Sequence, residues 1–131
     1  MSKTNPRITK KERGLLKGCI RRTFSRSELR EKAVAASRVD HYDPLRKRVK
    51  KWSRCMECQT LTPTYMLEVD HVDPIIPTTS SFEDMSFDEV VDRTWCPENR
   101  LKAICPECHE IKTKKENEER KRFKKEKKAN E

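Results

Sequence analysis

The sequence has too little apolar material for an ordinary hydrophobic core. Only 33% of its 131 residues are hydrophobic and 6% are aromatic, while 40% are charged. A globular domain is usually about half apolar and about a quarter charged, and a chain of this length corresponds to one domain. We therefore expect parts of the chain to lie outside the core, or another interaction to staple the fold.

Long hydrophobic runs are also missing, which excludes two classes of protein. No apolar segment approaches the roughly 20 residues that a membrane-spanning helix requires. Residues 1–19 lack the apolar stretch of a secretory signal. The sequence therefore predicts a cytoplasmic protein with no membrane partner, in a compartment where disulfides are rare and paired cysteines more often bind a metal.

Charge is distributed unevenly along the chain, although the net charge is +9. Residues 1–54 carry a balance of +13, residues 55–113 a balance of −8, and residues 114–131 a balance of +4. The two basic segments suit a polyanion such as nucleic acid, and a solvated helix surface is the alternative. The acidic centre, with its carboxylates and cysteines, suits a metal cation.

Two capping patterns predict the first two helices. A capping box at residues 9–12 precedes apolar residues at helical spacing, which indicate a helix near 10–22. Another box at residues 25–28 precedes a narrow apolar stripe that runs to about Ser37. Cys19 lies on the apolar stripe of the first helix, so we expect it to pack as a small hydrophobic residue.

A third helix and a basic surface complete the expected N-terminal arm. Asp43 followed by Pro44 is typical of an N-cap with proline at the first helical position, and the apolar stripe of this helix is Leu45, Val49 and Trp52. We expect the arm to bind backbone phosphate, with docking on a protein partner as the alternative. The candidate nucleic-acid-binding residues are Arg21, Arg22, Arg26, Arg30, Arg46, Lys47 and Arg48.

The centre of the chain predicts short strands followed by helices. Two strand-like stretches, Leu61–Tyr65 and Met66–His71, follow one another closely. A capping pattern then precedes an amphipathic helix over 87–95. A last helix is expected from Pro106, and the tail over 118–131 is either a solvated helix or a disordered basic segment.

Two Cys-x2-Cys pairs, Cys55 with Cys58 and Cys105 with Cys108, predict a structural zinc site. Each pair lets two thiolates from one tight turn reach the same ion, and together they complete a tetrahedral site with no open position for substrate. Bound zinc would tie the two ends of the acidic centre together and replace missing core. A redox pair and ordinary buried cysteines are the alternatives. Cys96 is expected to pack against the core, with a metal ligand as the alternative.

Three further side chains lie beside these features and suggest metal-dependent catalysis. Asp70 and His71 end the second strand-like stretch, and His109 directly follows the last cysteine pair. Asp70 offers a hard oxygen and His109 an imidazole nitrogen, which together could hold one divalent cation. His71 would be free to act as a base near neutral pH. Each has a simpler alternative as a turn, structural or zinc-binding residue, and Arg93 and Arg100 are weaker candidates for phosphate contact.

The order and spacing of these motifs resemble the HNH endonuclease family, and more narrowly the small HNH proteins of tailed bacteriophages. The resemblance covers about residues 52–117 and implies a ββα-metal finger, stapled here by zinc. The expected fold class is α+β, with an HNH nuclease domain over 52–117, a basic helical N-terminal arm over 1–51 and a basic tail over 118–131. The motifs are Cys55-x2-Cys58, Leu67-Glu68-Val69-Asp70-His71-Val72-Asp73-Pro74, Asn99-Arg100-Leu101, Ile104-Cys105-Pro106-Glu107-Cys108-His109 and Lys112-Thr113.

The resemblance implies hydrolysis of DNA phosphodiester bonds, as a nick or a double-strand cut, with one Mg²⁺ or Mn²⁺ ion. In the family's roles, His71 activates the water, and Asp70 and His109 bind the catalytic metal. Asn99 holds the His71 loop by hydrogen bonding to backbone. The span from His71 to Asn99 is longer than in the shortest members, so the role of Asn99 depends on its Asn-x-Leu context.

The resemblance also implies DNA as partner, no small-molecule substrate, and the cytoplasm of a phage-infected bacterial cell. Some similar phage proteins act beside the packaging terminase, so the arm has a terminase as its alternative partner. The alternative function is a non-catalytic, zinc-stapled module that binds DNA or a terminase. A sequence-specific homing endonuclease ranks lower, because so short a chain offers little surface for reading bases.

Overall fold

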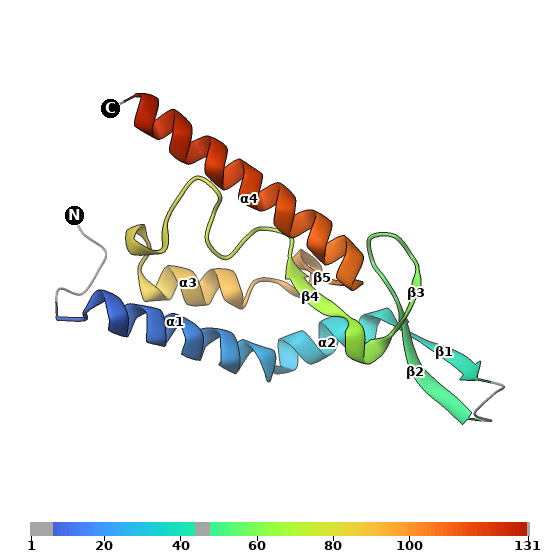
Figure 1. The fold of residues 1–131 in the computed structure, drawn as a ribbon. Helices are drawn as coiled ribbons and strands as arrows, with labels where there is room; N and C mark the ends of the chain where they lie inside the picture. Colours follow the sequence, from blue (N-terminus) through green and yellow to red (C-terminus); the bar gives the residue numbers. More distant parts are fainter. Residues whose placement is uncertain (1–6, 44–47, 131) are drawn as a thin grey trace.

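The computed structural model describes the backbone of residues 7–43 and 48–130, and the side chains of residues 7–39 and 51–130. This part of the chain forms a small α+β structure with four α-helices and two small sheets. Figure 1 shows the first and last helices on opposite sides of a long loop. A two-stranded hairpin follows the second helix and projects beyond it. No helix in the described ranges is both long and apolar enough to cross a lipid bilayer.

The first two helices begin at side-chain caps. The capping box before α1 (Lys10–Ser25) is confirmed, because Glu12 N donates to Thr9 Oγ1 and Thr9 N donates to Glu12 Oε1. Helix α2 (Glu28–Ser37) is also confirmed, but its N-cap is Ser27, which accepts from the Arg30 backbone N–H. The predicted box starting at Ser25 is wrong, because α1 extends through that residue.

The predicted third helix is wrong, because its residues form a β-hairpin. Strand β1 (Arg38–Asp43) pairs antiparallel with β2 (Arg48–Arg54). In this register Val39 pairs with Trp52, a β-branched residue opposite an aromatic one, and both types have high strand propensity. The expected N-cap at Asp43 and Pro44 extends into residues 44–47, which lie outside the described residues.

The two predicted strand-like stretches are confirmed as strands, but they belong to different sheets. Strand β3 (Leu61–Pro63) extends the hairpin by pairing with β2. Strand β4 (Glu68–His71) pairs antiparallel with β5 (Leu101–Ile104), a strand that the sequence pattern did not indicate. A single 3₁₀ turn, Thr64–Met66, separates β3 from β4.

The last two helices agree with expectation. Helix α3 (Phe87–Thr94) begins at Ser86, whose hydroxyl accepts from the Glu89 backbone N–H at 3.2 Å. Helix α4 (Pro106–Ala129) has proline in its first turn, where no backbone N–H is needed. It remains helical through most of the basic tail, so the solvated-helix alternative describes the tail correctly.

Two small buried clusters form the core. One consists of Phe24, Ala33 and Leu101, and it joins both N-terminal helices to β5. Cys96 packs against this cluster, as expected. The other is Cys55, Ile104 and Cys105, so two of the candidate metal ligands are themselves part of the core.

Cys19 differs from its prediction. Its side chain is exposed, with the Arg22 guanidinium donating to Sγ at 3.2 Å. Exposed leucines on the same helix show why, since Leu15 is 61% and Leu16 41% exposed. The helix packs instead through Arg13 and Phe24, its two buried residues.

Candidate functional site

The four predicted zinc ligands converge on one point. The Sγ atoms of the two cysteine pairs all lie within 4.8 Å of one another. A zinc ion with Zn–S bonds of about 2.3 Å in a tetrahedron places its sulfurs about 3.8 Å apart, and Cys58 Sγ lies 3.8 Å from Cys105 Sγ. The residues present therefore fit a structural metal ion of the zinc type, and the candidate ligands are Cys55, Cys58, Cys105 and Cys108.

Hydrogen bonds to two of the sulfurs favour the thiolate form, which is the form that binds a metal. The Thr60 hydroxyl, 3.1 Å from Cys58 Sγ, and the Thr60 backbone N–H lower the pKa of Cys58 to about 6. Burial opposes ionisation of Cys55, but backbone N–H groups, including that of Cys105 at 3.3 Å, outweigh burial and lower its pKa. The neighbouring sulfurs of Cys105 and Cys58 raise the pKa of Cys108. Adjacent thiolates repel one another, and a bound cation removes that repulsion.

The cysteine cluster also fixes the neighbouring elements. Met56 N donates to Ala103 O at 2.9 Å, which ties the first cysteine turn to β5. His109 N donates to Cys105 O at 3.0 Å, so His109 belongs to the first hydrogen-bonded turn of α4. The position of His109 therefore depends on the same turn that carries two of the thiols.

Three of the predicted catalytic residues, Asp70, His71 and His109, line one cavity of about 290 Å³. Strand β4 supplies Asp70 and His71, and α4 supplies His109. Among the described residues, the four cysteines are the only group of three or more metal-binding side chains. Asp70, His71 and His109 therefore line one cavity without forming a further group of that kind.

His71 is held in one tautomer. Its Nε2 lies 2.8 Å from the backbone carbonyl oxygen of Thr94, a buried residue at the end of α3. A carbonyl can only accept, so Nε2 carries the hydrogen and the neutral ring has its lone pair at Nδ1. The Phe24 ring lies 4.9 Å from the imidazole, centroid to centroid, and limits its rotation. The arrangement provides an oriented imidazole with one basic nitrogen.

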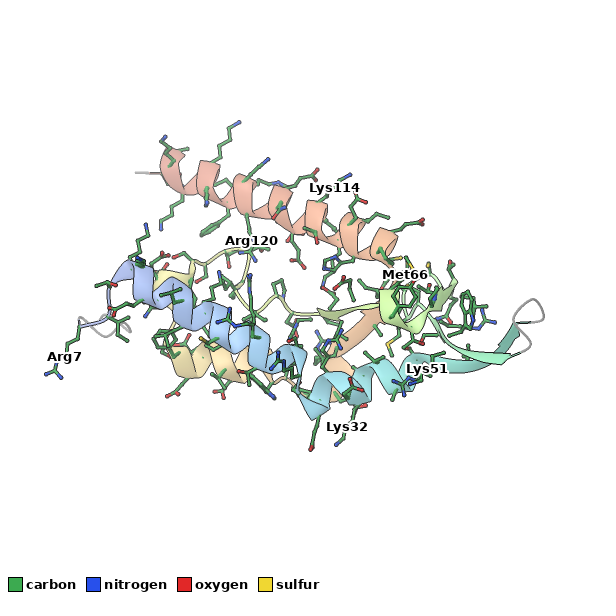
Figure 2. The ribbon with its side chains drawn as sticks, turned by 60° about the horizontal axis from the view of Figure 1, so that its bottom comes forward. Arg7, Lys32, Lys51, Met66, Lys114 and Arg120 are labelled. Carbon is green, nitrogen blue, oxygen red and sulfur yellow. The ribbon has the colours of Figure 1, made fainter. Side chains whose placement is uncertain are left out.

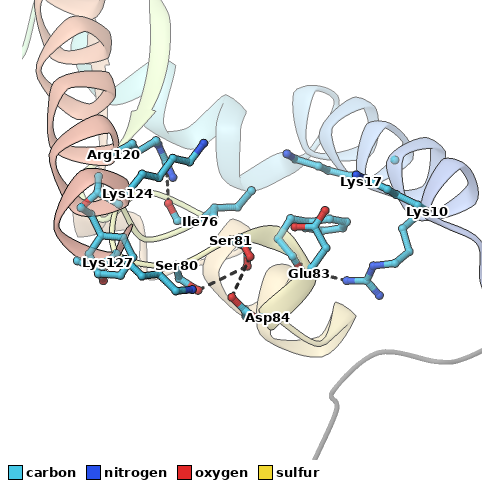
Figure 3. Close-up of a pocket in the computed structure, with 16 residues that line it drawn as sticks. Lys10, Lys17, Ile76, Ser80, Ser81, Glu83, Asp84, Arg120, Lys124 and Lys127 are labelled. Carbon is cyan, nitrogen blue, oxygen red and sulfur yellow. Dashed lines mark hydrogen bonds between the residues drawn. The ribbon is translucent and has the colours of Figure 1, made fainter. Parts of the chain in front are cut away.

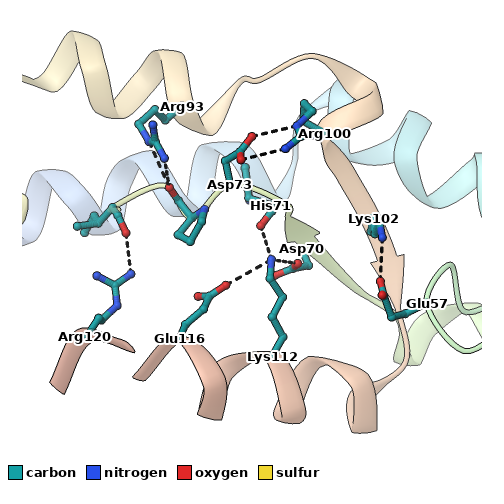
Figure 4. A network of polar contacts seen from close by, with 12 residues as sticks. Glu57, Asp70, His71, Asp73, Arg93, Arg100, Lys102, Lys112, Glu116 and Arg120 are labelled. Atoms are coloured by element: carbon teal, nitrogen blue, oxygen red, sulfur yellow. Dashed lines mark hydrogen bonds and ion pairs between the residues drawn. The ribbon is translucent and has the colours of Figure 1, made fainter. Parts of the chain in front are cut away.

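Asp70 is engaged by a lysine from α4. The Lys112 ammonium donates to Asp70 Oδ2 and to the His71 carbonyl oxygen, and it lies 3.3 Å from Glu116 Oε1 (Figure 4). Both members of the Lys112–Asp70 pair are largely buried. The negative charge of the Asp70 carboxylate is therefore already paired with an ammonium group. Lys112 competes with any divalent cation for this carboxylate.

Asn99 lies apart from the cavity. It is exposed in the 3₁₀ turn Glu98–Arg100 and makes no side-chain hydrogen bond within the described ranges. The chain after His71 is fixed by neighbouring groups instead, since Val72 N donates to Arg100 O at 2.9 Å. Arg100 also donates through two nitrogens to Asp73, which lowers the pKa of that carboxyl.

Arginines from three helices hold the long loop between β4 and α3. Arg93 of α3 donates to the carbonyl oxygens of Pro74 and Ile75. Arg120 of α4 donates to the Ile76 carbonyl at 2.7 Å, and Arg13 of α1 to the Met85 carbonyl at 3.1 Å. Arg93, considered above for phosphate contact, is thus occupied with backbone carbonyls.

The predicted nucleic-acid-binding residues are spread over the N-terminal elements. Arg21 lines the cavity with His71. Arg22 and Arg26 are exposed on or just after α1, and Arg30 is half-buried on α2. Arg46 and Lys47 lie outside the described residues, and the side chain of Arg48 does too.

Three residues at the cavity were not singled out as site residues from the sequence. Lys17 and Arg120 line it beside Arg21, and Glu116 lines it beside His109. No local pattern marks Lys17 or Arg120, because they become neighbours only when α1 and α4 approach the same loop. Figure 2 shows Arg120 directed from α4 toward that loop, whereas Lys114 is directed away.

Comparison of the chain with protein-family models, curated proteins and solved structures finds no match.

Proposed function

We propose that this chain is a metal-dependent endonuclease of the HNH type, which hydrolyses phosphodiester bonds in DNA. One observation supports this most directly: Asp70, His71 and His109 line the same cavity, beside a four-cysteine cluster of zinc dimensions. Residues separated by nearly forty positions in sequence meet there. Their types are the ones that single-metal phosphodiester hydrolysis requires.

His71 acts as the general base in this proposal. The Thr94 carbonyl holds the hydrogen at Nε2, so Nδ1 accepts the proton from the attacking water. A positioned general base contributes about 10²–10⁴-fold in rate. The contact with Phe24 restricts the ring and keeps that nitrogen in one orientation.

Asp70 and His109 are the protein ligands for a catalytic divalent ion, Mg²⁺ or Mn²⁺. Bound there, such an ion would supply a Lewis acid for a phosphoryl oxygen and for the leaving 3′ oxygen. The carboxylate oxygen suits either ion, whereas an imidazole nitrogen is a ligand more typical of transition metals, so this donor pair favours Mn²⁺ over Mg²⁺. Lys112 must yield Asp70 to the ion, and Glu116 offers it a partner one helical turn away.

Basic side chains around the cavity favour an anionic substrate. Lys17, Arg21 and Arg120 all line it. Their charge offsets that of the acidic centre, which would otherwise repel DNA from Asp70. The proposed structural zinc stays outside this chemistry, since its four ligands leave no open position.

The test is a plasmid assay with purified zinc-loaded protein. Supercoiled DNA should become open-circular or linear when Mg²⁺ or Mn²⁺ is added, and should remain intact without an added divalent ion. His71→Ala should lose cleavage while keeping its zinc and its thermal unfolding temperature. His41→Ala is the matched control, because it removes a histidine located in β1. Equal cleavage by the His71→Ala and wild-type proteins would refute the assignment.

A second function deserves a test because of one contact. The Lys112–Asp70 ion pair satisfies the carboxylate without a divalent ion, as expected of a non-catalytic zinc-stapled module that binds DNA or a terminase. That alternative predicts DNA binding with no cleavage at any divalent ion concentration. Co-purification of the full chain with a terminase would identify the protein partner.

A further inference from the structure

A second cavity, called the groove below, opens between α1 and α4. It has a volume of about 540 Å³, and its walls are α1, α4 and residues 76–84 of the loop between β4 and α3 (Figure 3). Lys17, Ile76 and Arg120 line both this groove and the cavity that contains His71. The groove therefore leads directly into the proposed catalytic cavity.

The groove carries a surplus of positive charge. Six basic side chains line it against two acidic ones, and one of these, Asp84, accepts a hydrogen bond from Ser81. None of the four lysines forms an ion pair in the described part of the chain. The basic residues are Lys10, Arg13, Lys17, Arg120, Lys124 and Lys127.

Arg13 adds a buried charge to the wall of the groove. It is only 6% exposed, and its guanidinium lies over the rings of Phe82 and Phe87 at 4.7 and 4.8 Å. Two of its nitrogens, Nε and Nη1, are buried without a hydrogen-bond partner. Its other contacts are backbone carbonyls, so no described carboxylate neutralises it.

The pKa of Lys17 is lowered, in part by the same excess of positive charge. Partial desolvation lowers its pKa first, and the nearby charges of Arg21 and Arg120 lower it further, against a smaller opposing effect of Glu83. An anion between α1 and α4 would relieve this repulsion. Because the lysines continue along α4 to Lys127, the groove matches a chain of negative charges better than a single anion.

One aromatic side chain offers a flat surface in this basic groove. Phe123 of α4 lines it, is half-buried, and makes no ring contact with other described residues. Phe82 is different, because Arg13 and Lys17 already lie over its ring. A basic groove with an available aromatic ring is the usual combination for single-stranded nucleic acid, whose unpaired bases stack on the ring.

We infer that the groove between α1 and α4 binds a single-stranded segment of nucleic acid and guides its phosphates toward His71. Lys10, Lys17, Lys124 and Lys127 contact phosphates, and Phe123 stacks with one unpaired base. The inference rests on the proposed nuclease function, because the strand is that enzyme's substrate. It specifies a substrate with an unpaired strand, such as a single strand, a flap or an opened duplex.

The test measures binding by fluorescence anisotropy, with no added divalent ion, to a labelled single-stranded oligonucleotide and to the same sequence as a duplex. The groove variant is Lys17→Gln with Lys124→Gln. Its control, Lys11→Gln with Lys121→Gln, removes two exposed charges from the same helices outside the groove. Losing two phosphate contacts should reduce the log–log salt slope for the single strand by about 1.4 in the groove variant, with little change in the control.

Phe123→Leu tests the stacking contact and keeps an apolar side chain. It should weaken single-strand binding at least about fivefold and leave duplex binding nearly unchanged. Equal weakening in groove and control variants, an equal effect of Phe123→Leu on both DNA forms, or equally strong competition by polyglutamate would overturn the inference. These measurements need no cleavage, so failure of the nuclease proposal appears separately, in the plasmid assay.

Discussion

Loss of one zinc ligand should unfold the centre of the protein, and Cys108→Ser is the most informative substitution. Cys108 is only half-buried, whereas Cys55 is fully buried and belongs to the core. Replacing Cys108 therefore removes a ligand with little loss of packing. Its effect on stability should report metal binding rather than a cavity.

The magnitude follows from how little else holds this region. The cluster around the thiols contains one buried aliphatic side chain, Ile104, besides Cys55 and Cys105. Structural zinc contributes about 10–16 kcal/mol of apparent folding free energy in small peptides, while whole domains are stable by only about 5–15 kcal/mol. Losing even a third of the zinc contribution, about 3–5 kcal/mol, would remove much of the total.

The assay combines elemental analysis with urea denaturation followed by tryptophan fluorescence. Wild-type protein should contain one zinc per chain, and the Cys108→Ser protein should lose zinc and unfold at a much lower urea concentration. Cys19→Ser is the matched control, because this thiol is exposed on α1. If the Cys108→Ser protein contained no zinc and yet unfolded at the wild-type urea concentration, stabilisation of the fold by zinc would be refuted.

Three further predictions follow from individual contacts. Phe24→Ala should lower the free energy of unfolding by about 3–5 kcal/mol, because Phe24 is 8% exposed and contacts His71 and Trp95; urea denaturation checks this against Leu15→Ala, which should change it by less than about 0.5 kcal/mol. Lys112→Gln should lower the Mg²⁺ concentration for half-maximal cleavage, because Asp70 loses its competing cation; an unchanged requirement in a magnesium titration would argue against Asp70 as a ligand. The bond from Arg100 lowers the pKa of Asp73, so the small stability difference between wild type and Asp73→Asn should be full above the ordinary pKa of an aspartate and disappear as the pH falls through the lowered one; melting temperatures across acidic pH measure it.

Local signals in the sequence predicted the features that depend on local interactions. The capping box of Thr9 and Glu12 closes within one helical turn, as does the Ser86 cap of α3. The two cysteine pairs were also predictable, because their spacing suits one ion whatever the fold between them. Their convergence within 4.8 Å is the tertiary consequence of that chemistry.

The failures concern pairing between distant or ambiguous segments. The apolar positions Leu45, Val49 and Trp52 fit a helical stripe, but cross-strand partners favour the hairpin, as the pairing of Val39 with Trp52 shows. Strand β5 is only four residues long and exists through its pairing with β4. Lys17 and Arg120 belong to helices that the sequence treats as separate basic segments, so their meeting at one cavity had no local signal.

The long span between His71 and Asn99 gives the molecule a second feature besides the four-cysteine cluster. Within it, residues 76–84 form a wall of the groove, and Arg13 and Arg120 hold this loop to α1 and α4. The proposed base is held by the Thr94 carbonyl oxygen, which belongs to the same span, and by the Phe24 ring of α1. The span therefore contributes to both proposals, because Thr94 at the end of α3 orients His71 and residues 76–84 form a wall of the groove. Substitutions in residues 76–84 should therefore change the binding of a strand, whereas a displacement of Thr94 should change the orientation of His71.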